Sequence, residues 1–237
     1  MSASNYKEAL THPIFEIITE AADELNVPAF VIGGYVRDFF LKRGNKTDID
    51  IVAVGNGIEL AKLVSTKLSN NPKVQIFKTY GTAMLKAFDA EIEFVGARKE
   101  SYNENSRNPE VEQGTLTDDQ NRRDFTINAL ALQLNKKHFG DLLDPFNGIS
   151  HLGEELIKTP LDPDITYSDD PLRMMRAIRF ASQLNFKIEL QSLDAITKNA
   201  NRIKIVSKER IMTEFNKIML SEVPSVGLKL LHKTKLL

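Results

Sequence analysis

Strand-like and helix-like patterns occupy different parts of this sequence. Before residue 100, the predicted strands are short apolar runs: AFVIGG, DIDIVAV, VQIFKTYG, TAMLKAF and EIEFVGAR. The predicted helices between them are IFEIITEAADEL after His12-Pro13, YVRDFFLKR, and a segment near 57–70. From Pro171 onward every segment has helical periodicity, in PLRMMRAIRFASQL, LQSLDAITKNA and SKERIMTEFNKIML. This order predicts an α+β fold, with a mixed-sheet domain followed by an all-helical domain.

The boundary between the two domains is predicted close to Gly148–Tyr167, where DLLDPFNGI leads into a stretch rich in Pro and Asp. We therefore predict domains at 1–150 and 151–237. Residues 99–120 are polar and have no sustained apolar period, so we expect a mobile or poorly ordered loop there.

Composition excludes several kinds of site. The chain has no cysteine, so it has neither disulfides nor a thiolate zinc site, and its four histidines lack metal-ligand spacing. No apolar run approaches the ~20 residues that a membrane span needs, and the start lacks a signal-peptide pattern. We expect a cytoplasmic protein that does not enter a membrane.

Positive charge is concentrated near the end of the sequence, although the net charge is only −1. From residue 198 onward, three glutamates accompany nine basic residues: Lys198, Arg202, Lys204, Lys208, Arg210, Lys217, Lys229, Lys233 and Lys235. This stretch could face the phosphates of a nucleic acid. A solvated helical surface explains the same residues equally well.

Two carboxylates, Asp48 and Asp50, begin the second predicted strand. Because side chains alternate along a strand, both carboxylates are expected on one face. Like charges held together attract a cation, and Mg²⁺ held by carboxylates can bridge a nucleoside triphosphate and activate an attacking hydroxyl. Taken alone, a strand-initiating turn would account for this pair just as well.

A glycine pair precedes these carboxylates. Gly33 and Gly34 end the first predicted strand and a helix starts at once, so bare backbone amides and a helix terminus could receive a triphosphate. Arg37, one turn into that helix, adds a charge-assisted donor for a phosphate. The sequence contains neither GxxxxGK[ST] nor GxGxxG, so neither P-loop nor Rossmann binding is indicated.

The whole run GGYVRDFFLKRGNKTDID resembles the signature of the DNA polymerase β-type nucleotidyltransferases, in the form used by class II CCA-adding enzymes and bacterial poly(A) polymerases. The run RRDFTINAL is similar to the family motif that contacts the ribose. Within it, Arg123 and Asp124 offer a donor and an acceptor for sugar hydroxyls, and Arg122 could support the phosphates. DLLDPFNG resembles the hinge between the head and neck of these enzymes.

The segment DDPLRMMRAIRF resembles the base-recognition motif EDxxR of class II enzymes, with Asp169 where Glu is usual. Asp170 and Arg173 are three apart on a predicted helix and are expected side by side. Cytosine and adenine each present an amino donor beside a ring-nitrogen acceptor, so this pair matches C and A but leaves U and G unpaired. Arg176 and Arg179 follow on the helix, to reach the triphosphate or to hold the aspartates.

Two further groups are expected to have lesser roles. SKERIMTE resembles the neck element that follows in the family, where Ser207 as N-cap and an Arg210–Glu214 pair would stabilise a helix. Glu91 and Glu93 alternate on a strand, and either is a candidate third carboxylate near the metal, although the sequence does not favour this assignment.

The resemblance, from about Phe30 to Leu220, implies a nucleotidyltransferase head and a helical neck that add CMP and AMP from CTP and ATP to tRNA 3′ ends with Mg²⁺. Family members continue into helical body and tail domains, so we expect an N-terminal fragment. Three alternatives remain open: a poly(A) polymerase, an enzyme that adds only CC or only A, and a nucleotide- or RNA-binding module without catalysis.

Overall fold

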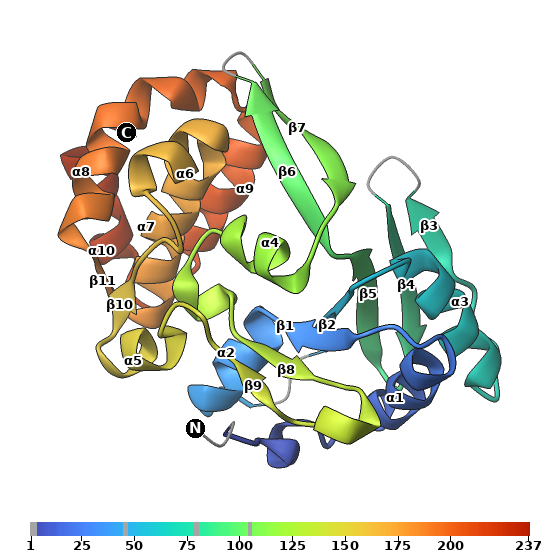
Figure 1. The fold of residues 1–237 in the computed structure, drawn as a ribbon. Coiled ribbons are helices and arrows are strands. Elements are labelled where there is room, and N and C mark those ends of the chain that lie inside the picture. Colours follow the sequence, from blue (N-terminus) through green and yellow to red (C-terminus); the bar gives the residue numbers. More distant parts are fainter. Residues whose placement is uncertain (1–3, 45–46, 78–80, 104–105) are drawn as a thin grey trace. The chain divides into compact units, whose positions relative to one another are not determined.

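The computed structural model describes residues 4–44, 47–77, 81–103 and 106–237 (Figure 1). The chain divides into two compact units. The sheet unit comprises Met1–Lys99, Glu112–Gln120 and Asn128–Pro145, and the helical unit comprises Glu100–Val111, Asn121–Ile127 and Phe146–Leu237. The predicted α+β fold class is confirmed. The predicted domain limits at residue 150 stay a prediction, since these units are discontinuous in sequence.

A seven-stranded mixed sheet forms the sheet unit, in the order β3-β4-β5-β2-β1-β8-β9. Its strands are β1 (Ala29–Ile32), β2 (Asp48–Ala53), β3 (Gln75–Phe77), β4 (Thr82–Ala87), β5 (Ala90–Gly96), β8 (Ala131–Gln133) and β9 (Leu142–Leu143). β2 and β5 run parallel, whereas the other neighbouring strands are antiparallel. All four residues of β1 are buried, as the apolar run AFVI predicts for an interior strand.

The helices of the sheet unit include α1 (Ile14–Glu24), α2 (Gly34–Phe40) and α3 (Gly57–Lys67), with 3₁₀ turns η1 (Lys7–Ala9) and η4 (Lys136–His138). α1 buries Ile14, Phe15 and Ile18 on one face, because apolar residues recur at helical spacing. α1 packs on α3, and α3 packs on β4 and β5 (Figure 1). The side chain of Asn56 caps α3 by accepting hydrogen bonds from two backbone amides.

The helical unit contains α5 (Gly148–Gly153), α6 (Pro163–Asp169), α7 (Leu172–Leu184), α8 (Leu190–Asn199), the 3₁₀ turn η5 (Ala200–Ile205), α9 (Lys208–Met219) and α10 (Pro224–Lys233). α7 is its central helix and packs against α6, α9 and α10 (Figure 1). α6 packs along α8, where the buried Tyr167 hydroxyl donates to the hydroxyl of Ser192 over 3.2 Å. Within the described part of the chain, no helix is long and apolar enough to span a membrane.

Two expectations about local structure were wrong. The polar segment 99–120 contains β6 (Arg98–Asn103), β7 (Ser106–Gln113), which form a two-stranded sheet, and most of α4 (Leu116–Asn121). Backbone hydrogen bonds hold such a sheet without requiring an apolar period, which explains why the sequence pattern did not reveal it. After Pro171 the chain is not wholly helical, because β11 (Lys187–Ile188) pairs in parallel with β10 (Leu156–Ile157). The short 3₁₀ turn η3 (Thr126–Asn128) precedes β8.

Candidate active site

Four carboxylates lie on two neighbouring strands of the sheet unit, β2 and β5. Asp48 is exposed and Asp50 is partly exposed, whereas Ile49 between them is buried, as strand alternation predicts. In the parallel pairing of β2 with β5, Asp48 lies opposite Glu91 and Asp50 lies opposite Glu93. Residues paired in register point to the same face of a sheet. We call Asp48, Asp50, Glu91 and Glu93 the carboxylate edge.

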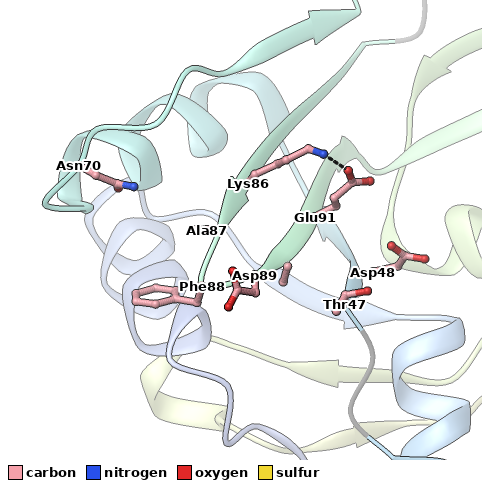
Figure 2. A pocket seen from close by; sticks show the side chains of 9 residues that line it. Thr47, Asp48, Asn70, Lys86, Ala87, Phe88, Asp89 and Glu91 are labelled. Atoms are coloured by element: carbon pink, nitrogen blue, oxygen red, sulfur yellow. Dashed lines mark ion pairs between the residues drawn. The ribbon is translucent and has the colours of Figure 1, made fainter.

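An open depression of about 530 Å³ lies at one end of this edge. It is lined by Asp48, Asn70, Glu91 and the turn between β4 and β5 (Figure 2). Lys86 forms an ion pair with Glu91, so one carboxylate of the edge is already compensated. The two turn residues, Phe88 and Asp89, have φ angles of 50° and 62°, as a two-residue hairpin turn requires.

The donor chemistry of the edge fits a hard divalent cation, because Mg²⁺ prefers carboxylate oxygens and binds through one or two of them plus a substrate phosphate. Among the residues that the structure describes, no three acidic or histidine side chains are gathered closely enough to hold a metal alone. Asp48 and Asp50 are therefore the fitting pair, and a third protein ligand is not supported.

The glycine pair has the backbone geometry of a tight turn. Gly33 has φ 81° and ψ −130°, a conformation that residues with a side chain rarely adopt, and it precedes the first turn of α2. The Gly33 amide donates to the carbonyl of Leu130 over 3.1 Å, which ties the turn to the sheet. Gly34 needs glycine less, since an added Cβ would meet only the end of the Arg37 side chain at 3.8 Å.

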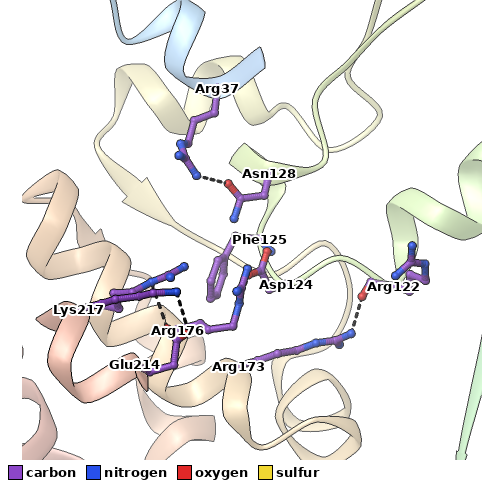
Figure 3. Close-up of polar contacts among 10 residues, drawn as sticks. Arg37, Arg122, Asp124, Phe125, Asn128, Arg173, Arg176, Glu214 and Lys217 are labelled. Atoms are coloured by element: carbon purple, nitrogen blue, oxygen red, sulfur yellow. Dashed lines mark hydrogen bonds and ion pairs between the residues drawn. The ribbon is translucent and has the colours of Figure 1, made fainter. Parts of the chain in front are cut away.

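The guanidinium of Arg37 is turned into the protein. It donates to both carboxylate oxygens of Asp38 at 2.9 and 3.0 Å. It also donates to the side-chain oxygen of Asn128 at 2.6 Å (Figure 3). Arg37 and Asp38 are only 6% and 1% exposed. The predicted phosphate contact of Arg37 stays a prediction, and in this structure its donors hold α2 against the segment that contains Asn128.

In the helical unit, Asp124 and Arg176 form a close ion pair. The Arg176 Nε donates to the Asp124 carboxylate over 2.7 Å, and its Nη2 lies 2.6 Å from the same oxygen (Figure 3). The other Asp124 oxygen accepts from the amide of Phe125. The Asp124 carboxylate raises the pKa of the Arg176 guanidinium still further above its usual range. Arg176 therefore holds Asp124, a role that had been expected toward Asp169 and Asp170.

Asp170 and Arg173 do not share a helix, so that expectation was wrong. Asp170 is the residue after α6, and Pro171 separates it from the start of α7. The carboxylate of Asp170 accepts from the amide of Leu172 over 3.2 Å, as a residue that caps a helix does. The buried Arg173 guanidinium donates to the carbonyl of Arg122 over 2.5 Å, which joins the two motifs.

The remaining predicted residues of this unit lie around that contact. The Arg122 Nη1 donates to the carboxylate of Glu100 over 3.3 Å, and Arg123 is partly exposed. Burial raises the pKa of the Asp169 carboxyl above its usual range, and the charges of Arg173 and Arg202 oppose that shift. Arg202 also donates to the carbonyl of Ser168 from two nitrogens.

Arg179 has a partner that the sequence reasoning missed. Its Nε lies 3.2 Å from a carboxylate oxygen of Glu214 on α9, and both side chains are under 10% exposed. Its guanidinium also lies over the ring of Phe180, 4.3 Å from the centroid. Glu214 was expected to pair with Arg210, and it also lies 3.8 Å from the Nζ of Lys217. A carboxylate among apolar helix positions was the available signal for a long-range partner.

Comparison with known proteins gives two matching family models. The model described as the poly A polymerase head domain matches residues 29–158, and that described as the probable RNA and SrmB-binding site of polymerase A matches residues 185–237. The chain is 39% identical to the A-adding tRNA nucleotidyltransferase of Aquifex aeolicus, over 76% of this chain and 21% of that protein. It is 35% identical to the CCA-adding enzyme of Pediococcus pentosaceus, over 92% of this chain and 53% of that protein.

Solved structures give the same relationship. A CCA-adding enzyme in apo form II matches with a TM-score of 0.88 and 30% identity, over 100% of this chain and 57% of that one. A tRNA nucleotidyltransferase complexed with a primer tRNA and an incoming ATP analogue matches with a TM-score of 0.79 and 31% identity. The match covers 92% of this chain and 60% of that one. The chain spans about half the length of most of these relatives. Its own match over residues 29–158 shows that the chain belongs to the poly(A) polymerase head domain family.

Proposed function

We propose that this protein is a tRNA nucleotidyltransferase that adds CMP and AMP from CTP and ATP to the 3′ end of tRNA, which builds the CCA terminus and releases pyrophosphate. The observation that carries the proposal is the carboxylate edge, where Asp48 and Asp50 share one face of β2 beside an open depression. The CCA-adding enzymes among the relatives support the choice of substrates.

Asp48 and Asp50 would hold Mg²⁺, which when bound neutralises triphosphate charge and activates a hydroxyl. The chain's own contribution is mainly positioning, because phosphoryl transfer needs little covalent chemistry from a protein. The Gly33–Gly34 turn would bring backbone amides close to the triphosphate, and Gly33 holds the required left-handed conformation.

Recognition of the nucleotide would fall to the predicted site residues of the helical unit. Asp170 and Arg173 would read the amino and ring-nitrogen groups shared by cytosine and adenine. Asp124, Arg122 and Arg123 would face the ribose and the phosphates. The Asp124–Arg176 pair and the Arg173 contact with the Arg122 carbonyl support this assignment, because they restrict these side chains before a nucleotide binds. Asp169 would contribute a carboxyl, and Arg179 would act through the packing of α7.

A narrower activity is the second candidate. A-only addition is favoured by the Aquifex aeolicus relative, which is named an A-adding enzyme and is 39% identical over its matched region. Poly(A) addition and a binding module without catalysis remain the further alternatives, and the carboxylate pair argues against the second of these. We propose the cytoplasm as the location, although a relative in Candida glabrata is named as mitochondrial.

The test is incubation of the protein with Mg²⁺, a tRNA that lacks its CCA end, and each labelled triphosphate separately. Two additions from CTP, followed by one A only when ATP is also present, would support the proposal. A single A added only to tRNA that ends in CC would identify an A-adding enzyme, and a long A ladder from ATP alone would identify a poly(A) polymerase. Nucleotide binding with no incorporation, measured on the full-length protein, would favour the binding module.

A further inference from the structure

A short segment near the N-terminus touches three separate parts of the sheet unit. Its contacting residues are Ser4, Asn5, Tyr6, Ala9 and His12, which we call the N-terminal clasp. These residues precede the region that matches the head-domain family, which begins at residue 29. The sequence reasoning gave them no role.

The first contact of the clasp is with the outer strand of the sheet. The Tyr6 amide donates to the carbonyl of Gly140 over 2.8 Å, and the Leu142 amide donates to the carbonyl of Ser4 over 3.0 Å. The side chain of Asn5 donates to the Phe139 carbonyl and to the Asp141 carboxylate, at 2.8 and 2.7 Å. The clasp therefore extends the sheet beyond β9 at a defined register.

Gly140 is shaped for this approach. Its φ is 85°, and a Cβ at this position would lie 2.8 Å from the backbone nitrogen of Lys7. Both the conformation and the space thus require glycine where the clasp passes. Because a side chain at residue 140 would displace the N-terminal clasp, the sheet unit accommodates the clasp only with glycine at this position.

The second contact is with α2. The ring of Tyr6 packs edge-on against Phe40 and Phe39, with centroids 4.9 and 6.5 Å apart. The hydroxyl of Tyr35 donates to the carbonyl of Ala9 over 2.9 Å. A helix of seven residues is too short to be stable alone, so packing of this kind must hold it.

The third contact reaches the turn that lines the depression beside Asp48. The ring of His12 lies edge-on to Phe88, with centroids 6.1 Å apart, and also contacts Phe15 at 6.2 Å. Phe88 has φ 50°, which is uncommon for an aromatic residue, and it is 51% exposed. The His12 ring is therefore a contact that ties this exposed turn to the N-terminal clasp.

We propose that the N-terminal clasp positions the nucleotidyl-transfer site, with Tyr6 as its main positioning residue. This inference rests on the proposed function. The clasp joins α2, which follows Gly33 and carries Arg37, to the turn beside Asp48. By fixing both elements, it sets the distance between the triphosphate-binding turn and the carboxylate edge. Tyr6 itself touches no reacting atom.

The test compares the full chain with three variants: Tyr6→Ala, Tyr6→Phe and Glu8→Ala. Tyr6→Ala removes the ring and Tyr6→Phe restores it. Glu8 is an exposed neighbour outside the clasp, and its variant is the matched control. For each variant, hydrogen exchange is measured at Arg37 of α2 and at Leu41 and Lys42, whose amides donate to the α2 carbonyls of Arg37 and Phe39; we call these three the α2 amides. The constants kcat and KM are measured for nucleotide incorporation below the unfolding temperature.

In Tyr6→Ala we expect exchange at the α2 amides to accelerate and KM for the triphosphate to rise, each by about five- to tenfold, which corresponds to the loss of two aromatic pairs. Tyr6→Phe should restore both values, and Glu8→Ala should change neither. If Tyr6→Ala does not fold, Tyr35→Phe removes only the hydroxyl contact with Ala9, and we expect the same two shifts at about two- to fivefold.

Unchanged α2 exchange in a folded Tyr6→Ala variant would overturn the clasp. Faster exchange with unchanged kcat and KM would show that the clasp holds α2 but would overturn the positioning role, because Tyr6 would then serve stability alone. A wild-type protein that incorporates no nucleotide would instead refute the proposed function. In that case the exchange measurement still decides whether the clasp holds α2.

Discussion

The charged side chains of the carboxylate edge and those of the three arginines on α7 differ in their exposure and in their partners. At the edge, Asp48 is exposed, and Lys86 forms an exposed ion pair with Glu91. On α7, Arg173, Arg176 and Arg179 are held respectively by the Arg122 carbonyl, Asp124 and Glu214. Asp48 thus keeps its negative charge accessible to solvent, whereas the three arginines of α7 bind to carboxylates or a carbonyl within the helical unit.

The difference separates chemistry from stability. An exposed carboxylate contributes little to folding, so its removal should affect only what it binds. A buried ion pair is costly to break, because the partner that remains is a charge without compensation. We therefore expect substitutions at the carboxylate edge to change activity and substitutions of the α7 ion pairs to change stability.

The largest effect is expected for Asp48→Ala. Loss of a metal-binding carboxylate should lower nucleotide incorporation by about 10³-fold, since metal charge stabilisation amounts to several kcal/mol. The free energy of unfolding should change by less than ~0.5 kcal/mol, because the side chain is exposed. Urea denaturation and a primer-extension assay measure the two quantities.

Glu59→Gln is the matched control for Asp48→Ala, since Glu59 is another exposed carboxylate of the sheet unit, on α3. It should leave incorporation unchanged. Retention of full activity in Asp48→Ala would refute the metal assignment. A large loss of stability would break the comparison instead, by showing that the edge also supports the fold.

The second prediction concerns Glu214→Ala. Its partner Arg179 would lose this buried ion pair, so the free energy of unfolding should fall by about 3–5 kcal/mol. Replacing both residues with apolar ones, as in Arg179→Met with Glu214→Leu, should recover most of this loss. Chemical denaturation of Arg179→Met, Glu214→Leu and the double variant measures the coupling. Equal losses in the single and double variants would contradict the role of uncompensated charge.

Asp124→Asn is expected to have an effect of intermediate size. Asp124 is 8% exposed, but the Arg176 side chain is 35% exposed, so solvent can compensate the arginine that remains. We expect a loss of stability of about 1–2 kcal/mol, together with weaker nucleotide binding. Denaturation and titration with CTP give the two values. Arg176→Gln should destabilise by a similar amount, and a much larger loss in either variant would indicate that the pair is as isolated from solvent as Arg179 and Glu214.

The sequence allowed the order of elements and the carboxylate pair to be predicted, because both depend on local patterns. AFVI and DIDIVA form strands where the apolar runs indicated them, and α1 begins directly after His12-Pro13. Strand alternation alone placed Asp48 and Asp50 on one face. The register of β2 against β5, which brings Glu91 and Glu93 to the same edge, is a long-range property.

The partners of the arginines could not be predicted for the same reason. Asp170 and Arg173 were assigned to one helix by their spacing, but Pro171 begins a new helix after Asp170. Arg179 and Glu214 are far apart in sequence, and only the packing of α7 against α9 brings them together. The β6–β7 pair left no apolar signal, so a polar segment was taken for a loop.

The smallest effect is expected for an exposed ion pair of the helical unit. Asp164, in the first turn of α6, accepts from Lys198 in the last turn of α8 over 2.7 Å, and the two side chains are 43% and 71% exposed. The hydrogen bond and charge of Lys198 lower the pKa of the Asp164 carboxyl. A lowered folded-state pKa adds stability above the unfolded value of about 3.9, and this stability is lost as the pH falls through the folded-state pKa.

Asp164→Asn should therefore cost only ~0.5 kcal/mol at neutral pH, because solvent screens an exposed pair, and the difference from wild type should narrow as the pH drops below about 4. Urea denaturation at several pH values measures this narrowing, and Lys198→Gln should reproduce it if the pair is responsible. A difference that stays constant with pH would assign the effect to the position of Asp164 in the first turn of α6. A loss of stability as large as that of Glu214→Ala would show that burial does not explain the difference between the exposed and the buried ion pair.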